Sequence, residues 1–458
     1  MSRQALVRKD ELHTRTDAER ASERVLRPFH QFARWQASSA LLLLVGAVGA
    51  VVWANSPWAS SYEQMLHAPL RLSLGDRALE LDLRHWINDG LMAVFFFAVG
   101  LEIKREFLVG ALADRRNAML PIAAAIGGMV VPALCYAAFN LGGEGAHGWG
   151  IPMATDIAFA LGALAVLGSR IPGGLKVFLV ALAIVDDLGA LLVIAVVYTA
   201  SINWSGLALA AVCLAAFFVA NRAGARRAPI YLALGMGAWY GLLISGVHAT
   251  LAGVLAALFV PARVRIVPEA LAGIIRRSAD AIDVHAATGV RGAMEPERFA
   301  TTSVLSQTLD EGNSPIQRFE HMVHPWVAFG IVPVFALFNA GVAIDASAIR
   351  TLAFPVPLGI MTGLVLGKPA GICLASWLAV KAGLATLPEG VSWRHLCGTA
   401  WLAGIGFTMA LFISGLAFTG PGLESQAKLG ILLGSLVSAI IGIAILITPR
   451  RGVEALPE

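Results

Sequence analysis

The chain has 458 residues, of which 57% are hydrophobic and only 14% are charged. That composition, with a mean hydropathy of +0.72, is too apolar for a water-soluble protein of this length and predicts a polytopic membrane protein. The net charge of +4 is explained by lysines and arginines in the loops between apolar segments, so no nucleic-acid partner is needed to account for it.

Three polar segments stand outside the apolar part of the chain. Residues 1–35 are too long and too mixed for the start of a signal peptide, and no convincing cleavage site follows, so we expect a cytoplasmic tail. Residues 264–323 are charged and lack helical periodicity, which predicts a flexible cytoplasmic insertion between eight membrane helices in 36–263 and four in 324–448. Residues 449–458 form a second cytoplasmic tail.

Twelve apolar segments have lengths close to those of membrane-spanning helices, which need about 20 residues to cross roughly 30 Å of hydrocarbon. Most of the 34 lysines and arginines fall in alternate loops, and the positive-inside rule then places both termini in the cytoplasm. The division within 229–262 is the least secure, because Gly241, Ser245 and Gly246 separate two short runs. The sequence predicts an all-α fold with spans at 36–54, 86–103, 118–140, 150–168, 175–200, 204–221, 229–244, 247–262, 325–344, 355–380, 396–418 and 426–448.

The loop near 69–84, between the first two spans, has a different pattern. Leucines alternate there with polar residues on either side of Gly75-Asp76, which predicts a β-hairpin on the periplasmic side. A two-stranded hairpin is marginal alone in water, so its apolar face favours a partner. A second subunit is the candidate, which would make the protein a homodimer.

The most telling polar residues are Asp186 and Asp187, the only charges in the run VFLVALAIVDDLGALLVIAVV over 177–197. A carboxylate at the centre of a membrane helix costs about 2.5 to 3.5 kcal/mol on insertion scales, so we expect this acid pair to be functional. Adjacent residues on a helix point about 100° apart, so one acid can face a basic residue while the other faces a cation site. Acids held permanently in ion pairs are the structural alternative.

Other ionisable residues that stand out within the apolar segments are Asp89, Asp156, His248 and Lys368. Lys368 lies near the middle of span 355–380, which favours a buried ion pair over a side chain that reaches a membrane surface. Its anionic partner is Asp156 or one member of the acid pair. Because there is one lysine for three acids, a purely structural role for all of them is disfavoured.

Two spans contain signs of interrupted helices. In the fourth span a proline precedes Thr155 and Asp156, and in the eleventh the segment AGIGFTMALFISG places Gly404, Gly406 and Thr408 together. Such breaks expose backbone carbonyls and helix ends that can coordinate ions, and their occurrence in two halves of a chain points to a transporter's binding site. Close glycine-mediated helix packing is the alternative. Spans 3–5 and 10–12 then form a repeat pair, and the odd number of helices in each forces inverted topology.

Seven segments in order resemble the NhaA-type sodium/proton antiporters of bacteria. They are FFFAVGLEIKREF, PMATDIAFALGAL, ALAIVDDLGA, SGVHATLAGV, HPWVAFGIVPVFALFNAGV, LGKPAGI and AGIGFTMALFISGLAF. The resemblance covers about 34–448 apart from the insertion. It implies a multi-pass protein of the inner membrane that serves pH and sodium homeostasis.

The resemblance also implies roles for individual residues. Asp187 is expected to be the principal ligand of Na+, and Asp186 is expected to pair with Lys368 and to take part in the proton chemistry. Thr155 and Asp156 are expected to lie where the two broken helices cross. The implied pH-regulatory candidates are His248, Asp89, Glu102, Lys104, Arg105 and Glu106. For the charged cluster the alternative is a set of interfacial anchors, and for His248 it is a core histidine with satisfied hydrogen bonds.

The chemistry expected of the acid pair is competition between two ions. Sodium is a hard cation that prefers oxygen ligands, and carboxylates bind it when deprotonated, so sodium and protons compete. We therefore expect exchange of cytoplasmic Na+ or Li+ for external H+ by alternating access. The same acids could instead line a sodium channel, which would move no protons in return. An intramembrane aspartyl protease is a further alternative, but the G-x-G-D element of such enzymes is absent.

Neither a cofactor nor an enzymatic activity is indicated. The four cysteines lie singly in or beside apolar spans without C-x-x-C spacing, at positions 135, 213, 373 and 397. The sequence therefore predicts neither a disulfide framework nor a structural metal site. The expected partners are Na+, Li+, H+, membrane lipid and a second subunit.

Overall fold

The computed structural model describes residues 38–74, 77–168, 171–199, 202–223, 228–262, 273, 314–344, 346–418 and 420–448. Both expected tails, 1–35 and 449–458, and most of the expected insertion lie outside the described residues. The end of that insertion is described and is helical. Helix α14 (Pro315–Trp326) begins ahead of the expected boundary at 324, with Ser314 and Gln317 forming a capping box that satisfies its first backbone amides.

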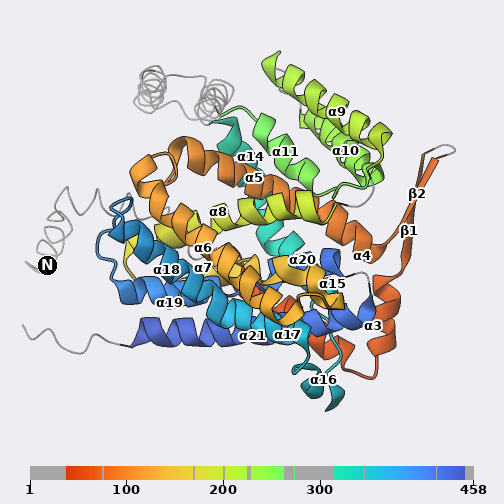
Figure 1. The fold of residues 1–458 in the computed structure, drawn as a ribbon. Coiled ribbons are helices and arrows are strands. Elements are labelled where there is room, and N and C mark those ends of the chain that lie inside the picture. The colour runs from red at the N-terminus through yellow and green to blue at the C-terminus, as the bar shows by residue number, and fades with distance from the viewer. Residues whose placement is uncertain are drawn as a thin grey trace, which may run out of the picture.

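Helices dominate the described part of the chain, as Figure 1 shows, and this confirms the expected helical class. Seven of them are long and apolar enough to cross a membrane, and the number reaches ten if each of three bent pairs is one span. Four of the seven are α6 (Arg115–Asn140), α8 (Gly173–Val197), α9 (Trp204–Arg222) and α21 (Pro421–Ile447). The other three each contain a π-helical turn: α4–η1–α5 (Leu83–His85, Trp86–Leu91, Met92–Val109), α14–η4–α15 (η4 Val327–Ile331, α15 Val332–Asn339) and α17–η5–α18 (Pro355–Thr362, Gly363–Gly367, Lys368–Lys381).

The three bent helix pairs differ in their bend angles. The first helix, Ser38–Ala54, turns by 116° into α3 (Ala59–Leu66). The two breaks expected from sequence are milder: η2 (Glu144–Met153) and α7 (Ile157–Val166) meet at 42°, and α19 (Trp393–Ala403) and α20 (Phe407–Ala417) meet at 43°. Shorter helices complete the described part: α10 (Ala228–Ser245) and α11 (Leu251–Phe259), in the segment of least secure division, and α16 (Ala346–Thr351).

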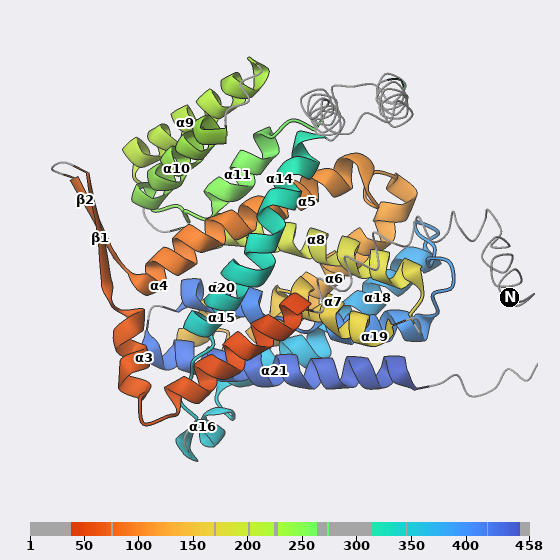
Figure 2. The ribbon, with the colours of Figure 1, turned by 180° about the vertical axis from the view of Figure 1, so that it is seen from behind.

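The expected hairpin is confirmed. Strands β1 (Pro69–Leu74) and β2 (Arg77–Asp82) pair antiparallel, with Leu70 opposite Leu81, and they extend away from the helices in Figures 1 and 2. Asp82 ends the hairpin and caps α4 by accepting a hydrogen bond from the His85 backbone amide at 2.7 Å. Burial alone would raise the pKa of Asp82, but the hydrogen bonds from His85 outweigh this effect. The pKa of Asp82 therefore lies below its usual value. This cap is therefore present above the ordinary aspartate pKa and is lost only as pH falls through the lowered one.

Close backbone contacts position the helices around the expected site. Helices α6 and α18 approach so closely that a Cβ added to Gly128 would lie 2.8 Å from the Ile372 side chain. Glycine at such contacts permits the short axial separations that membrane helices use in place of a hydrophobic driving force. In both views, α9 and α10 lie at the edge of the molecule away from α21, whereas α6, α7, α18 and α19 lie between α8 and α21.

An ion network joins the base of the hairpin to α21. Arg84 on α4 pairs with Glu424, and Lys428 Nζ lies 3.1 Å from the same carboxylate; these side chains are 10–19% exposed. We expect Glu424→Gln to lower the free energy of unfolding by about 1–2 kcal/mol, between the values for exposed and buried pairs, because two cations lose their partner. Thermal unfolding of the purified protein measures this. A loss no larger than that of Glu63→Gln, whose side chain is 67% exposed, would contradict it.

Candidate ion-binding site

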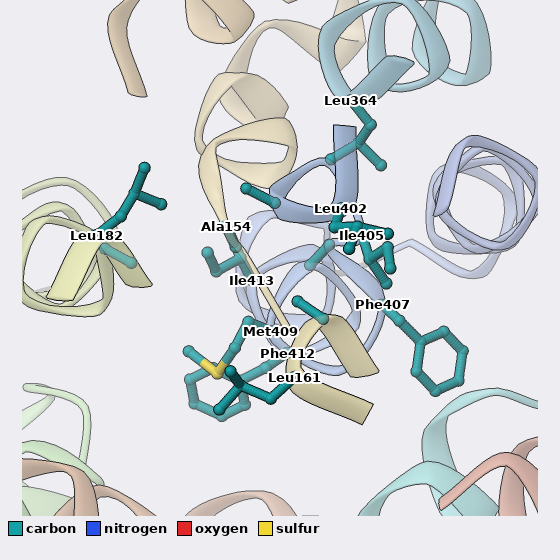
Figure 3. Close-up of a cluster of buried hydrophobic side chains, with 14 of the residues drawn as sticks. Ala154, Leu161, Leu182, Leu364, Leu402, Ile405, Phe407, Met409, Phe412 and Ile413 are labelled. Atoms are coloured by element: carbon teal, nitrogen blue, oxygen red, sulfur yellow. The ribbon is translucent and has the colours of Figure 1, made fainter. Parts of the chain in front are cut away.

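The two broken helices cross at their breaks and are hydrogen-bonded to each other there. The backbone amide of Asp156 donates to the carbonyl of Ile405 at 2.6 Å, and the Thr155 hydroxyl donates to the carbonyl of Ala403 at 2.9 Å. Carbonyls at a helix end lack intrahelical partners. Here the carbonyls of Ala403 and Ile405 accept hydrogen bonds from the opposite break instead. Figure 3 shows the apolar side chains packed around this crossing, including Ala154 and Leu161 from the first break and Phe407, Met409 and Phe412 from the second.

Asp156 links the starts of two helices. Its Oδ1 accepts the backbone amide of Phe159 at 3.0 Å, which caps α7. Its Oδ2 accepts the hydroxyl and the backbone amide of Thr408 at 2.6 and 3.0 Å, at the start of α20. The side chain is only 2% exposed. Because two helix N-termini, each carrying partial positive charge, point at one carboxylate, a buried negative charge is stabilised at the crossing.

Lys368 is fully buried, and its ammonium group has two partners. Its Nζ donates to Asp186 Oδ2 at 2.7 Å and also to the backbone carbonyl of Met153. Met153 is the last residue of η2, so this carbonyl belongs to a helix end and carries partial negative charge. The π-helical turn Gly363–Gly367 places the lysine at the start of α18. The third acid, Asp156, faces the helix starts instead.

Asp187 is the least satisfied acid in this region. It is 2% exposed, and its Oδ1 has no hydrogen-bond partner among the residues that the structure describes. The Oδ1 of Asp186 is also buried without a partner of normal geometry in that part of the chain. A buried ionised oxygen without a partner is costly, so such atoms call for a proton or a cation. A hard cation prefers oxygen ligands, so these two carboxylate oxygens of the acid pair are its candidate ligands.

Glycine at the second break is required by the crossing. A Cβ on Gly406 would lie 3.0 Å from the carbonyl of Ala154, and one on Gly404 would lie 2.5 Å from the carbonyl of Leu364. Any larger residue at these positions must therefore separate the two breaks or shift η5. The glycines expected at the broken helix thus serve the close approach of two backbones as well as the break itself.

Comparison with known proteins identifies the family. Residues 30–446 match the model of the family described as Na+/H+ antiporter 1. The chain belongs to this antiporter family. Among its relatives, the Na(+)/H(+) antiporter NhaA of Oleidesulfovibrio alaskensis is 48% identical over 94% of this chain and 96% of its own length. The Na(+)/H(+) antiporter NhaA 1 of Saccharophagus degradans is 49% identical over 93% of this chain and 92% of its own.

Two of the expected pH-regulatory residues of this antiporter-family chain, His248 and Asp89, make their hydrogen bonds away from the acid pair. His248 Nε2 lies 2.8 Å from the backbone carbonyl of Tyr198, just after the end of α8. Asp89 lies in η1, where its backbone carbonyl accepts a hydrogen bond from Trp239 at 2.8 Å. A hydrogen bond of this kind is what we expect of a core histidine, the alternative to a pH-regulatory role for His248.

The charged cluster on α5 forms its own network in this member of the family. Glu106 lies 2.9 Å from Arg105 and accepts the backbone amide of Ala111 at 2.8 Å, while Arg105 also pairs with Glu320 at 3.0 Å. Lys104 donates to the carbonyls of Leu258 and Val260 at 2.6 and 2.5 Å, which satisfies the end of α11. Glu102 shares this stretch of α5. Sequence reasoning missed Glu320, because it fell in the segment expected to be an insertion.

Proposed function

We propose that this chain is a secondary active transporter of the bacterial inner membrane that exchanges cytoplasmic Na+ or Li+ for external H+. The observation that carries the proposal is the buried acid pair, in which each aspartate has one oxygen without a partner among the described residues, beside the fully buried Lys368. The names of the relatives support it, since each is called a Na(+)/H(+) antiporter. The exchange would serve pH and sodium homeostasis.

The proposed roles follow from the contacts of each acid. Asp187, whose Oδ1 has no hydrogen-bond partner among the described residues, is the principal ligand of Na+, and its protonation displaces the ion. Asp186 alternates between its ion pair with Lys368 and a protonated state. Asp156 and Thr155 hold the crossing in register and present oxygens to the cation. Because each acid binds sodium only when deprotonated, occupation by either ion excludes the other.

Alternating access then needs no separate coupling device. If the empty, fully charged site is unable to reorient, only the sodium-bound and the protonated forms cross, and exchange results. The proposed architecture has twelve spans, both termini in the cytoplasm, and an inverted repeat of α6, η2–α7 and α8 with α17–α18, α19–α20 and α21. The middle member of each set is the broken helix, which supports this pairing.

The exchange is tested in sealed vesicles that hold a pH-sensitive dye. A pH gradient is imposed, the voltage is collapsed with a potassium ionophore, and sodium, lithium or potassium chloride is added in turn. We expect sodium or lithium to dissipate the gradient. A sodium current without proton movement would favour a channel and contradict the proposal, since a pore couples no proton to sodium.

The dimer proposed through the hairpin makes its own prediction. Leu70 and Leu81 are cross-strand partners on one face, whereas Arg71 and Glu80 are partners on the other, and Leu70 is 47% exposed. Replacing both leucines with asparagine is expected to weaken dimerisation by about a hundredfold or more, because two buried leucines contribute roughly 1.5–3 kcal/mol each. Light scattering in detergent measures the mass. The matched variant Arg71→Asn/Glu80→Asn should remain dimeric, and equal effects of the two variants would contradict this interface.

A further inference from the structure

Two cysteines that the sequence treats as isolated are in contact. The Sγ atoms of Cys373 on α18 and Cys397 on α19 lie 3.3 Å apart, and both residues are free thiols that are partly buried. A disulfide requires a sulfur–sulfur distance of about 2.05 Å, so the pair needs to close by little more than 1 Å. The two cysteines are 24 positions apart along the chain.

The positions of these cysteines connect them to the ion-binding site. Cys373 follows Lys368 by five residues on α18, which is about one and a half helical turns. Cys397 lies in the first half of the broken helix, two turns before Gly404. Helices α18 and α19 run side by side in both views (Figures 1 and 2). A bond between the two sulfurs would therefore join the helix of the lysine to the helix of the second break.

We propose that Cys373 and Cys397 form an oxidisable thiol pair, which hydrogen peroxide converts to a disulfide that slows ion exchange. One thiolate attacks the peroxide oxygen, which gives a sulfenic acid and releases water once the leaving oxygen takes a proton. The second thiol then displaces the sulfenic hydroxyl, forming the sulfur–sulfur bond and a second molecule of water. The two sulfurs together lose two electrons and two protons, and a thiol reductant reverses the change.

The effect on exchange rests on the proposed function. Lys368 is tied to Asp186 and to the Met153 carbonyl, and protonation of Asp186 weakens the first of these contacts because it removes the carboxylate charge. A covalent bond one and a half turns away restricts how far α18 can shift relative to α19. The disulfide therefore opposes the local rearrangement that each transport cycle requires.

The chemistry is tested on the full chain in detergent. The protein is treated with hydrogen peroxide, remaining thiols are alkylated, and peptides are mapped by mass spectrometry without reduction. We expect one cross-linked peptide joining Cys373 to Cys397, lighter by two hydrogen atoms. The variants Cys135→Ser and Cys213→Ser, at cysteines on α6 and α9, should keep it, whereas Cys373→Ser should lose it. Four alkylated cysteines after oxidation, or a link between two chains, would overturn the proposal.

The consequence is tested separately in vesicles. Oxidised wild-type protein is expected to lose most of its sodium-dependent proton movement and to regain it with dithiothreitol, while Cys373→Ser/Cys397→Ser stays active under both conditions. Full activity of a protein shown to be cross-linked would overturn the regulatory role. Failure of the proposed function looks different, because reduced wild-type protein would then show no exchange while the cross-linked peptide still formed.

Discussion

Asp187→Asn is expected to abolish sodium-dependent proton movement while leaving the protein folded. The substitution keeps the size of the side chain but removes both its charge and its protonation site. Loss of a contact to a charged group costs about 1.5–3 kcal/mol, so sodium affinity should fall by roughly 10- to 100-fold from this contact alone. Coupling should also fail, since the amide cannot carry a proton across.

The unfolding midpoint distinguishes a loss of exchange caused by the missing ligand from a loss caused by misfolding. Asp187 Oδ1 is buried without a hydrogen-bond partner in the described part of the chain, so removing its charge relieves an electrostatic cost. The unfolding midpoint of Asp187→Asn should therefore be unchanged or higher. Asp114→Asn, the same substitution at the exposed cap of α6, is the control and should exchange sodium at the wild-type rate. Undiminished exchange by Asp187→Asn would contradict the proposed ligand.

Lys368→Met is expected to be among the most destabilising single changes in this protein. Removing one partner of a buried ion pair costs about 3–5 kcal/mol, because the other charge is left uncompensated. Here Asp186 loses its ammonium partner, and the Met153 carbonyl loses its donor as well. The thermal midpoint in detergent and the yield of folded protein should both fall.

A second variant identifies the cause. If the cost comes from the uncompensated Asp186 carboxylate, Lys368→Met/Asp186→Asn should recover much of the lost stability, since neither of these two positions then carries a buried charge. Lys381→Met, at the other end of α18, is the matched control. Its ammonium group lies 4.5 Å from the centre of the Trp377 ring, a contact worth about 0.5–1 kcal/mol at an exposed site. A double variant as unstable as Lys368→Met would contradict the buried-pair explanation.

Much of the site could be predicted because charge inside a membrane is expensive. The acid pair, Asp156 and Lys368 stand out against apolar neighbours for that reason alone. The partner of Lys368 could be narrowed only to three acids, because the choice depends on how α8 and α18 are rotated against each other. Glycine and proline predicted two breaks, but not that the breaks would be hydrogen-bonded to each other.

Other features lay beyond sequence reasoning for identifiable physical causes. Helix α14 carries Glu320 and several other polar residues, so its sequence resembles that of a charged loop. Hydropathy finds apolar runs, and it misses a helix whose polar groups are satisfied by a neighbouring helix. Cys373 and Cys397 carry no motif, because their contact depends on the packing of two helices rather than on spacing along the chain.

The bridge formed by Asp156 has a consequence for how the protein is made. Its partner Thr408 is 252 residues further along the chain. At synthesis rates of roughly 5–20 residues per second, the first broken helix waits more than about ten seconds before the second exists. During that time the carboxylate of Asp156 lacks one of its two helix starts, and the first half of the protein is an incomplete assembly within the bilayer. Chains that stop short of Thr408 never leave that state.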